Sequence, residues 1–251
     1  MRSFASDNNS GVHPLVMDAL QRANEDHALG YGSDKWTDEA VAMLKESFTP
    51  ACEPLFVFNG TGSNIVALQL MVRPFHSIIC AETAHIYVDE CGSPVKNTGA
   101  QIRPVLTPDG KLTPELIRPY LHGFGDQHHS QPGAIYLSQC TELGTVYTPV
   151  ELKALTSLAH EHGMYVHMDG ARIANACAYL KTSLKEITAD CGIDVLSFGG
   201  TKNGLMMGEC VVIFNEELKA SAAFVRKQSA QLASKMRYLS CQFTAYLTDH
   251  L

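Results

Sequence analysis

The sequence lacks the features that mark several large classes of protein. It has no uninterrupted apolar run long enough to cross a membrane, and its start, Met-Arg-Ser-Phe-Ala-Ser-Asp, does not resemble a signal peptide. It also has no basic stripe, because 19 Lys and Arg are interspersed with 26 Asp and Glu for a formal net charge of −7. A surface for nucleic acid or for acidic lipid is therefore not expected. We expect a cytoplasmic protein with neither nucleic acid nor membrane as its partner.

Metal and disulfide signatures are missing as well. The eight cysteines are scattered and form no C-x-x-C pair, which favours buried thiols over disulfides. No H-E-x-x-H spacing occurs, and His160 and His162 lie two residues apart in an expected helix, so that their side chains point away from each other. No metal is expected.

What the chain does contain is an alternation of apolar runs and helix-like patterns. Its 251 residues are 45% hydrophobic and 18% charged, as is usual for one large globular domain or one and a half. The alternation predicts an α/β fold with a mostly parallel sheet and helices on both faces. Strands are expected at 56–58, 77–81, 100–106, 133–138, 164–166, 195–198 and 209–214, and helices at 14–27, from a cap at Thr37 or Asp38, and at 65–72, 114–121, 148–163 and 216–251.

A candidate nucleophile, Lys202, follows one of these strands. Small residues surround it in Ser197-Phe198-Gly199-Gly200-Thr201-Lys202-Asn203-Gly204, and the glycines leave room for a group to approach the backbone. An amine in such surroundings suits Schiff base formation, because desolvation disfavours the ammonium form. The same residues are also compatible with a surface turn that carries an exposed lysine.

Two further stretches end apolar runs with polar groups. Asp169 comes at the end of Tyr165-Val166-His167-Met168, where an α/β sheet places a carboxylate in its ligand crevice, although an Asp there also suits a helix cap. Phe56-Val57-Phe58 runs into Asn59-Gly60-Thr61-Gly62-Ser63-Asn64 and then into a helix, whose free amides suit a phosphate. Ile65 replaces the third glycine of a dinucleotide fingerprint, so a single phosphate is expected.

Together these stretches resemble pyridoxal 5'-phosphate (PLP) enzymes of fold type I, and most closely the low-specificity L-threonine aldolases of the β-eliminating lyase family. The resemblance runs nearly from end to end. It rests on Ser6-Asp7, Tyr31-Gly32, Gly60-Thr61-Gly62, Ala84-His85-Ile86-Tyr87 with Glu90, His167-Met168-Asp169-Gly170-Ala171-Arg172, and Gly200-Thr201-Lys202.

The resemblance implies a PLP-binding large domain over residues 1–251 and an obligate homodimer or homotetramer with active sites between subunits. The family usually continues into a small C-terminal domain, which we expect to be absent or truncated here. The implied site residues are as follows: Lys202, His85 and His128 are catalytic; Gly60, Thr61, Gly62, His85, Asp169, Arg172, Thr201 and Lys202 bind the cofactor; and Ser6, Tyr31 and Arg172 bind the substrate. His128 is preferred to His129 in a loop whose register is uncertain. The basic residues of the last predicted helix either reach the cofactor phosphate, commonly from a neighbouring subunit in the family, or lie on a solvated helix face; they are Arg226, Lys227, Lys235 and Arg237.

The implied reaction is cleavage of the Cα–Cβ bond of a β-hydroxy-α-amino acid such as L-threonine or L-allo-threonine, giving glycine and an aldehyde. Asp169 would keep the ring nitrogen protonated, Arg172 would hold the substrate carboxylate, and a water, His85 or His128 would take the hydroxyl proton. Two alternatives stay open: another PLP enzyme of the same fold, such as a β-eliminating lyase or an aminotransferase, and an inactive, truncated interaction or structural protein.

Overall fold

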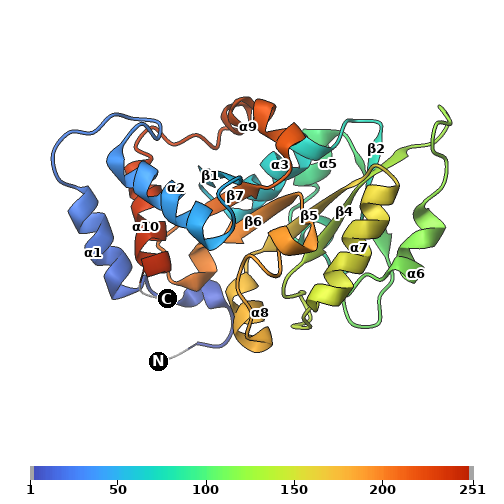
Figure 1. Ribbon diagram of the computed structural model, residues 1–251, viewed down its shortest axis with the longest axis horizontal. Helices are drawn as coiled ribbons and strands as arrows, with labels where there is room; N and C mark the ends of the chain where they lie inside the picture. Colours follow the sequence, from blue (N-terminus) through green and yellow to red (C-terminus); the bar gives the residue numbers. More distant parts are fainter. Residues whose placement is uncertain (1–2, 249–251) are drawn as a thin grey trace.

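Seven strands form one sheet in the computed structural model, which describes residues 3–248 (Figure 1). Their order across the sheet is β1-β7-β6-β5-β4-β2-β3. All neighbouring pairs are parallel except those of β7, which runs antiparallel to both β1 and β6. The mostly parallel sheet is thus confirmed. The strands are β1 Glu53–Val57, β2 His76–Ala81, β3 Gln101–Val105, β4 Gln131–Ser138, β5 Tyr165–Gly170, β6 Val195–Gly199 and β7 Glu209–Ile213.

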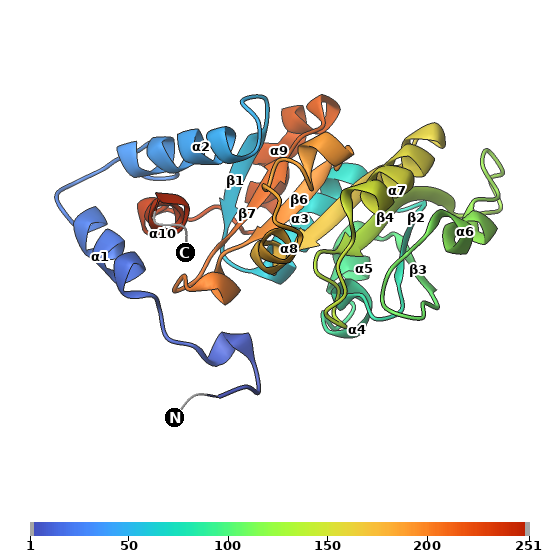
Figure 2. The same ribbon diagram turned by 60° about the horizontal axis from the view of Figure 1, so that its bottom comes forward.

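Helices cover both faces of this sheet, as predicted. In the described chain they are α1 Pro14–Ala23, α2 Lys35–Ser47, α3 Gly60–Met71, α4 His85–Val88, α5 Ser93–Thr98, α6 Pro114–Ile117, α7 Pro149–Glu161, α8 Ile173–Leu180, α9 Glu216–Gln228 and α10 Arg237–Thr248, with short 3-10 helices η1 Asp7–Asn9, η2 Arg118–Tyr120, η3 Ala189–Cys191 and η4 Thr201–Asn203. One face carries α3 and α9, and the other carries α7 and α8 together with α10, which packs against α1 and α2 (Figure 2).

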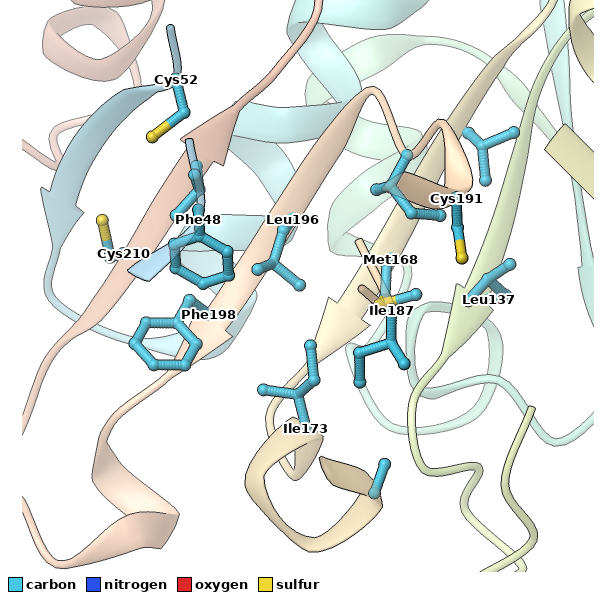
Figure 3. Close-up of a cluster of buried hydrophobic side chains, with 14 of the residues drawn as sticks. Phe48, Cys52, Leu137, Met168, Ile173, Ile187, Cys191, Leu196, Phe198 and Cys210 are labelled. Carbon is cyan, nitrogen blue, oxygen red and sulfur yellow. The ribbon is translucent and has the colours of Figure 1, made fainter. Parts of the chain in front are cut away.

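The core consists of two apolar layers, one on each side of the sheet. Strand residues alternate between them, so that Leu196 and Phe198 of β6 face one layer and Val195 faces the other. Figure 3 shows the first layer, in which Phe48, just after α2, meets the Phe198 ring edge-on at 5.3 Å between centroids. The strand that leads to Lys202 is therefore fixed by packing.

Helix boundaries agree with the sequence where capping signals are strong. Thr148 caps α7, Glu151 completes the capping box, and Gly163 follows the helix at a φ of +66°. The predicted cap of α2 is wrong, because Asp34 accepts the Thr37 N–H at 2.9 Å and begins the helix earlier.

Two other helix predictions need correction. The helix predicted from Ile65 begins at Gly60, since Asn59 caps it and turns the Gly-Thr-Gly segment into its first turn. The stretch predicted as one helix from Glu216 divides into α9 and α10, with Ala230 at a φ of +58° between them; residues 249–251 lie outside the described chain. Within residues 3–248, every helix is too short or too polar to cross a bilayer.

Candidate active site

A cavity of about 250 Å³ opens where the parallel strands end. The turns after β1, β2, β5 and β6 all contribute to it, which is where an α/β sheet places its ligands. Its lining residues are Asn8, Asn59, Gly60, Thr61, Asn64, His85, Ser138, Cys140, Glu142, Asp169, Ala171, Arg172, Ser197, Thr201, Lys202 and Glu209. The fold thus brings Lys202, Asp169, His85 and the start of α3 together, as the sequence predicts.

Lys202 lies on η4, three residues after the end of β6. Within residues 3–248, no carboxylate oxygen comes within 4 Å of its amine. The turn is held by the Asn203 side chain, which donates to the Ala171 and Gly199 carbonyls at 3.2 and 3.0 Å. The amine is therefore placed by its backbone and has no ionic partner in the described chain.

The glycines before Lys202 serve packing, which corrects the expectation that they leave room for a ligand. A Cβ at Gly199 would lie 2.6 Å from the Ala171 Cα, and one at Gly200 would lie 2.6 Å from the Gly208 carbonyl. Both approaches involve backbone, so neither position accepts a side chain.

Asp169 ends β5 and points a carboxylate at the cavity. Its Oδ2 accepts the Tyr136 hydroxyl at 2.7 Å and the Asn64 amide at 3.1 Å, and its Oδ1 accepts the Ala171 N–H at 2.9 Å. Burial raises its pKa, but these donors outweigh burial, and the pKa of Asp169 lies below its ordinary value. The group is ionised and keeps one acceptor position for a further donor. It is not the cap of α8, a position that Arg172 occupies.

His85 opens α4 at another edge of the cavity. Its Nδ1 lies 2.8 Å from Glu90 Oε1, and the Glu90 side chain is fully buried. That hydrogen bond raises the pKa of His85, although burial partly opposes it. Asn64 donates to Glu90 as well as to Asp169, so one amide bridges the histidine and aspartate sides of the site.

Arg172 is paired within the chain. Its Nε donates to Asp7 Oδ2 at 2.7 Å, and its terminal nitrogen donates to Oδ1 at 3.2 Å. Burial raises the pKa of Asp7, the guanidinium lowers it, and the net result is a pKa below the ordinary value. Arg172 is predicted to hold the substrate carboxylate. Its guanidinium is already oriented by another carboxylate, that of Asp7 on η1.

The predicted phosphate turn leaves fewer N–H groups for a phosphate than the sequence suggests. The Gly62 and Ser63 N–H groups both donate to Asn59, and a Cβ at Gly62 would lie 2.4 Å from the Gln231 side chain. Gly62 is therefore a packing position and not a cavity contact. In the described chain, the N–H groups of Gly60 and Thr61 have no protein acceptor and remain for an anion.

Besides Gly62, three predicted site residues do not line this cavity. Ser6 caps η1 by accepting the Asn8 N–H, Tyr31 is 57% exposed with the Lys227 amine over its ring, and His128 lies on the loop after η2. Within one chain these residues do not meet Lys202, and their roles stay predictions. The sequence patterns did not predict Asn64, Tyr136 and Glu209 as residues of the site. Of these, Asn64 follows the phosphate turn and offered a signal.

Glu209 is the least expected of these residues. It is 7% exposed, lines the cavity and accepts the Gly200 N–H at 2.7 Å. Burial raises the pKa of Glu209 to about 7. The cavity therefore contains a second buried acid, which differs from Asp169 in its charge near neutral pH.

A second hollow of about 1020 Å³ shares His85, Cys140, Glu142, Arg172 and Lys202 with the first. It provides an approach to Lys202 from outside.

Residues 3–248 hold no group of three His, Cys, Asp or Glu side chains arranged for a metal. His167 is fully buried beside Ser197, and burial lowers its pKa to about 4.

Comparison with known proteins places this arrangement in a family. The family model described as beta-eliminating lyase matches residues 3–245. The low specificity L-threonine aldolase of Pseudomonas aeruginosa is 44% identical over 99% of this chain and 72% of its own length. A Leishmania major threonine aldolase structure superposes with a TM-score of 0.94 at 33% identity, over 100% of this chain and 73% of that one.

The fold is also shared more widely. A Thermus thermophilus aspartate aminotransferase superposes with a TM-score of 0.70 at 17% identity, over 96% of this chain and 63% of that one. This distant likeness concerns the fold alone. Because the family model spans residues 3–245 and a relative is 44% identical over 99% of this chain, this protein belongs to the β-eliminating lyase family.

Proposed function

We propose that this protein is a PLP-dependent aldehyde-lyase that cleaves a β-hydroxy-α-amino acid, L-threonine or L-allo-threonine, to glycine and an aldehyde. Its relatives carry the name low specificity L-threonine aldolase over 99% of this chain. The observation that carries the proposal is the meeting of the Lys202 amine and the ionised Asp169 in one cavity. Neither the amine nor the last acceptor position of Asp169 is used within the described chain.

The residues present fit pyridoxal 5'-phosphate. Asp169 retains an acceptor position for a protonated ring nitrogen, and the Gly60 and Thr61 N–H groups face the cavity at the start of α3, where a phosphate would bind. When bound, the cofactor supplies an aldehyde for an amine and a ring that accepts the electron pair of a broken Cα bond. Thr201 and Lys202 would lie beside it from η4.

The chain's own groups divide the remaining work. Lys202 Nζ offers the nucleophilic amine, and Asp169 holds a proton at the ring nitrogen by its charge. Arg172 presents the guanidinium fork that suits an amino acid carboxylate, in competition with Asp7.

His85 is the proton-transfer candidate that the cavity contains. Glu90 holds its Nδ1, which leaves Nε2 as the nitrogen free to take the substrate's hydroxyl proton directly or through a water. The preference for His128 stays a prediction that needs a second copy of the chain, because His128 lies outside the cavity of its own chain.

The test is a spectrum together with a product assay. PLP added to the purified protein should shift its visible absorbance, and L-threonine should then yield acetaldehyde and glycine in equal amounts. L-alanine with a keto acid acceptor should give no amino transfer. Release of pyruvate or transfer of the amino group, without aldehyde, would point to another reaction of the same fold.

The Lys202→Ala variant completes the test. It should lose the absorbance shift and reduce turnover on the order of a thousandfold or more while unfolding at the same urea concentration as the parent. Lys181→Ala is the matched control, because Lys181 ends α8 outside both hollows. An active Lys202→Ala protein would refute the assignment.

We further propose that residues 3–248 are the cofactor-binding domain of a homodimer or homotetramer. Apolar side chains near the Lys202 turn are exposed, namely Phe58 at 38%, Met206 at 41% and Met207 at 46%. An exposed apolar group of this kind suits contact with a second copy. Light scattering at several protein concentrations measures the assembly, and a monomer throughout would contradict it.

A further inference from the structure

Glu209 is a buried acid that the steps above do not use. Its position follows from the sheet register: Glu209 pairs with Val57 of β1 on one side and with Gly199 of β6 on the other. Val57 leads into the Gly60 turn, and Gly199 leads into the Lys202 turn. The carboxyl group therefore lies between the turn that would hold the cofactor phosphate and the turn that carries Lys202.

This carboxyl group has no cation to balance it. Within residues 3–248, no Lys, Arg or His nitrogen lies within 4 Å of it, and Oε2 accepts the Gly200 N–H at 2.7 Å. A phosphate dianion beside an ionised Glu209 would meet like charge in a site of low dielectric. A neutral carboxyl group removes that repulsion and offers an O–H donor.

Resting on the proposed function, we propose that Glu209 takes up one proton from solvent when the cofactor phosphate binds, so that the phosphate's contribution to affinity weakens as pH rises. The proton bonds to a Glu209 carboxyl oxygen and is released when the phosphate leaves. No other bond changes.

The direction of the pH effect follows from the free protein. Burial raises the pKa of Glu209 to about 7, so the group is already neutral at pH 6 and binding requires no proton. Above that pKa, the phosphate contribution should fall by up to about tenfold per pH unit.

Other titratable or charged groups also face Glu209. They are Lys202 on η4, Asp169 on β5, the neighbouring Cys210 and Tyr246 on α10. Burial raises the pKa of both Cys210 and Tyr246, which keeps these two groups neutral. The sequences of α3 and β6 contain no charged residue, and Glu53 lies at the far end of β1. Lys202 and Asp169 act on the ring and aldehyde, which pyridoxal also has.

Comparing PLP with pyridoxal, which lacks the phosphate, therefore isolates the effect. Calorimetric titration of the cofactor-free protein at pH 8, in buffers of different ionisation enthalpy, counts the protons taken up. The phosphate itself is already a dianion at this pH, since its second pKa is about 6. We expect the protein to take up about one proton more on binding PLP than on binding pyridoxal. Equal proton uptake on binding PLP and on binding pyridoxal would overturn the inference without the need for any variant.

The Glu209→Gln variant gives a second measurement. For the parent, the ratio of the pyridoxal Kd to the PLP Kd should fall about tenfold or more between pH 7 and pH 8.5, and for Glu209→Gln it should stay constant. Glu53→Gln, a carboxylate removed at the other end of the β1–β7 pair, should behave like the parent. The same slope in parent and Glu209→Gln would refute Glu209 as the proton acceptor.

These outcomes separate the two proposals. Binding of PLP with a ratio that does not change with pH would overturn this inference and leave the proposed function in place. Failure of both compounds to bind at every pH would overturn the proposed function and this inference together.

Discussion

Two walls of one cavity each carry an acidic side chain, and the pKa values of the two acids shift in opposite directions. On the β5 wall, Asp169 accepts three hydrogen bonds, from Tyr136, Asn64 and Ala171. On the β7 wall, Glu209 is 7% exposed and accepts the Gly200 N–H. The pKa of Asp169 is lowered, whereas burial raises that of Glu209 to about 7. Burial acts on both groups: the donors at Asp169 outweigh it, whereas those that reach Glu209 from Gly200 and Thr201 do not.

The strongest way to break this comparison is to remove the charge of Asp169. Asp169→Asn keeps the shape but offers no negative charge to a protonated ring nitrogen. We expect kcat/KM for aldehyde release from L-threonine to fall about a hundredfold or more. The matched change on the other wall, Glu209→Gln, should stay within about threefold at pH 6, where that group is already neutral. Similar losses in the two variants would show that the walls are not different in charge.

Stability of the cofactor-free protein tests the Glu209 wall by itself. Because the folded pKa of Glu209 is raised, the group contributes stability below its unfolded pKa of about 4.3, and that contribution is lost as pH rises towards 7. Glu209→Gln has no such loss. Relative to the parent, the variant should therefore gain on the order of 2–3 kcal/mol in unfolding free energy between pH 4.5 and pH 8.

Urea unfolding of both proteins at several pH values measures this difference. Asp169 has the opposite sign, because its lowered pKa gives stability above the unfolded pKa that is lost only as the solution becomes more acidic. Parallel stability curves for the parent and Glu209→Gln above pH 4.5 would contradict the raised pKa.

The residues of the Asp169 wall were more predictable from the sequence than those of the Glu209 wall. Lys202 and Asp169 follow apolar strands, and the carboxyl ends of parallel strands meet at one edge, so their proximity was predictable. Glu209 begins β7, and its approach to Gly200 depends on β7 running antiparallel to β6. Nothing in an apolar run states its direction. Tyr136 lies in a plain buried strand, where alternation gives the face but not what the hydroxyl contacts.

Two predicted contacts involve groups that the chain itself already uses. Gly62 was expected to bind the phosphate, but its N–H donates to Asn59, which caps the helix so that it begins at Gly60 and not at Ile65. Arg172 was expected to hold the substrate carboxylate, and η1, near the start of the chain, places Asp7 against its guanidinium. Local patterns show which groups are present. Long-range pairing decides which are still available.

Arg172 gives a smaller test on the substrate side of the Asp169 wall. Arg172→Lys keeps the positive charge but loses the fork that holds Asp7 through two nitrogens. We expect the KM for L-threonine to rise about tenfold with kcat changed less than threefold, because the arginine holds the substrate in the ground state and in the transition state alike. PLP affinity, measured by absorbance, should not change. A loss of PLP affinity at unchanged KM would assign Arg172 to the cofactor instead.

The smallest expected effect concerns one donor to Asp169. Tyr136→Phe removes the hydroxyl at 2.7 Å, so the pKa of Asp169 should rise but stay below neutral, and activity at pH 7.5 should fall only two- to fivefold, on the order of 1 kcal/mol. Tyr147→Phe is the matched control, because that buried hydroxyl accepts the Leu112 N–H at 2.7 Å away from the cavity. Both variants should lose about 1–2 kcal/mol of unfolding free energy, and only Tyr136→Phe should lose activity. If Tyr136→Phe cost as much activity as Asp169→Asn, a single donor would control the charge of Asp169, and the combined effect of its three donors would not explain why the two walls differ.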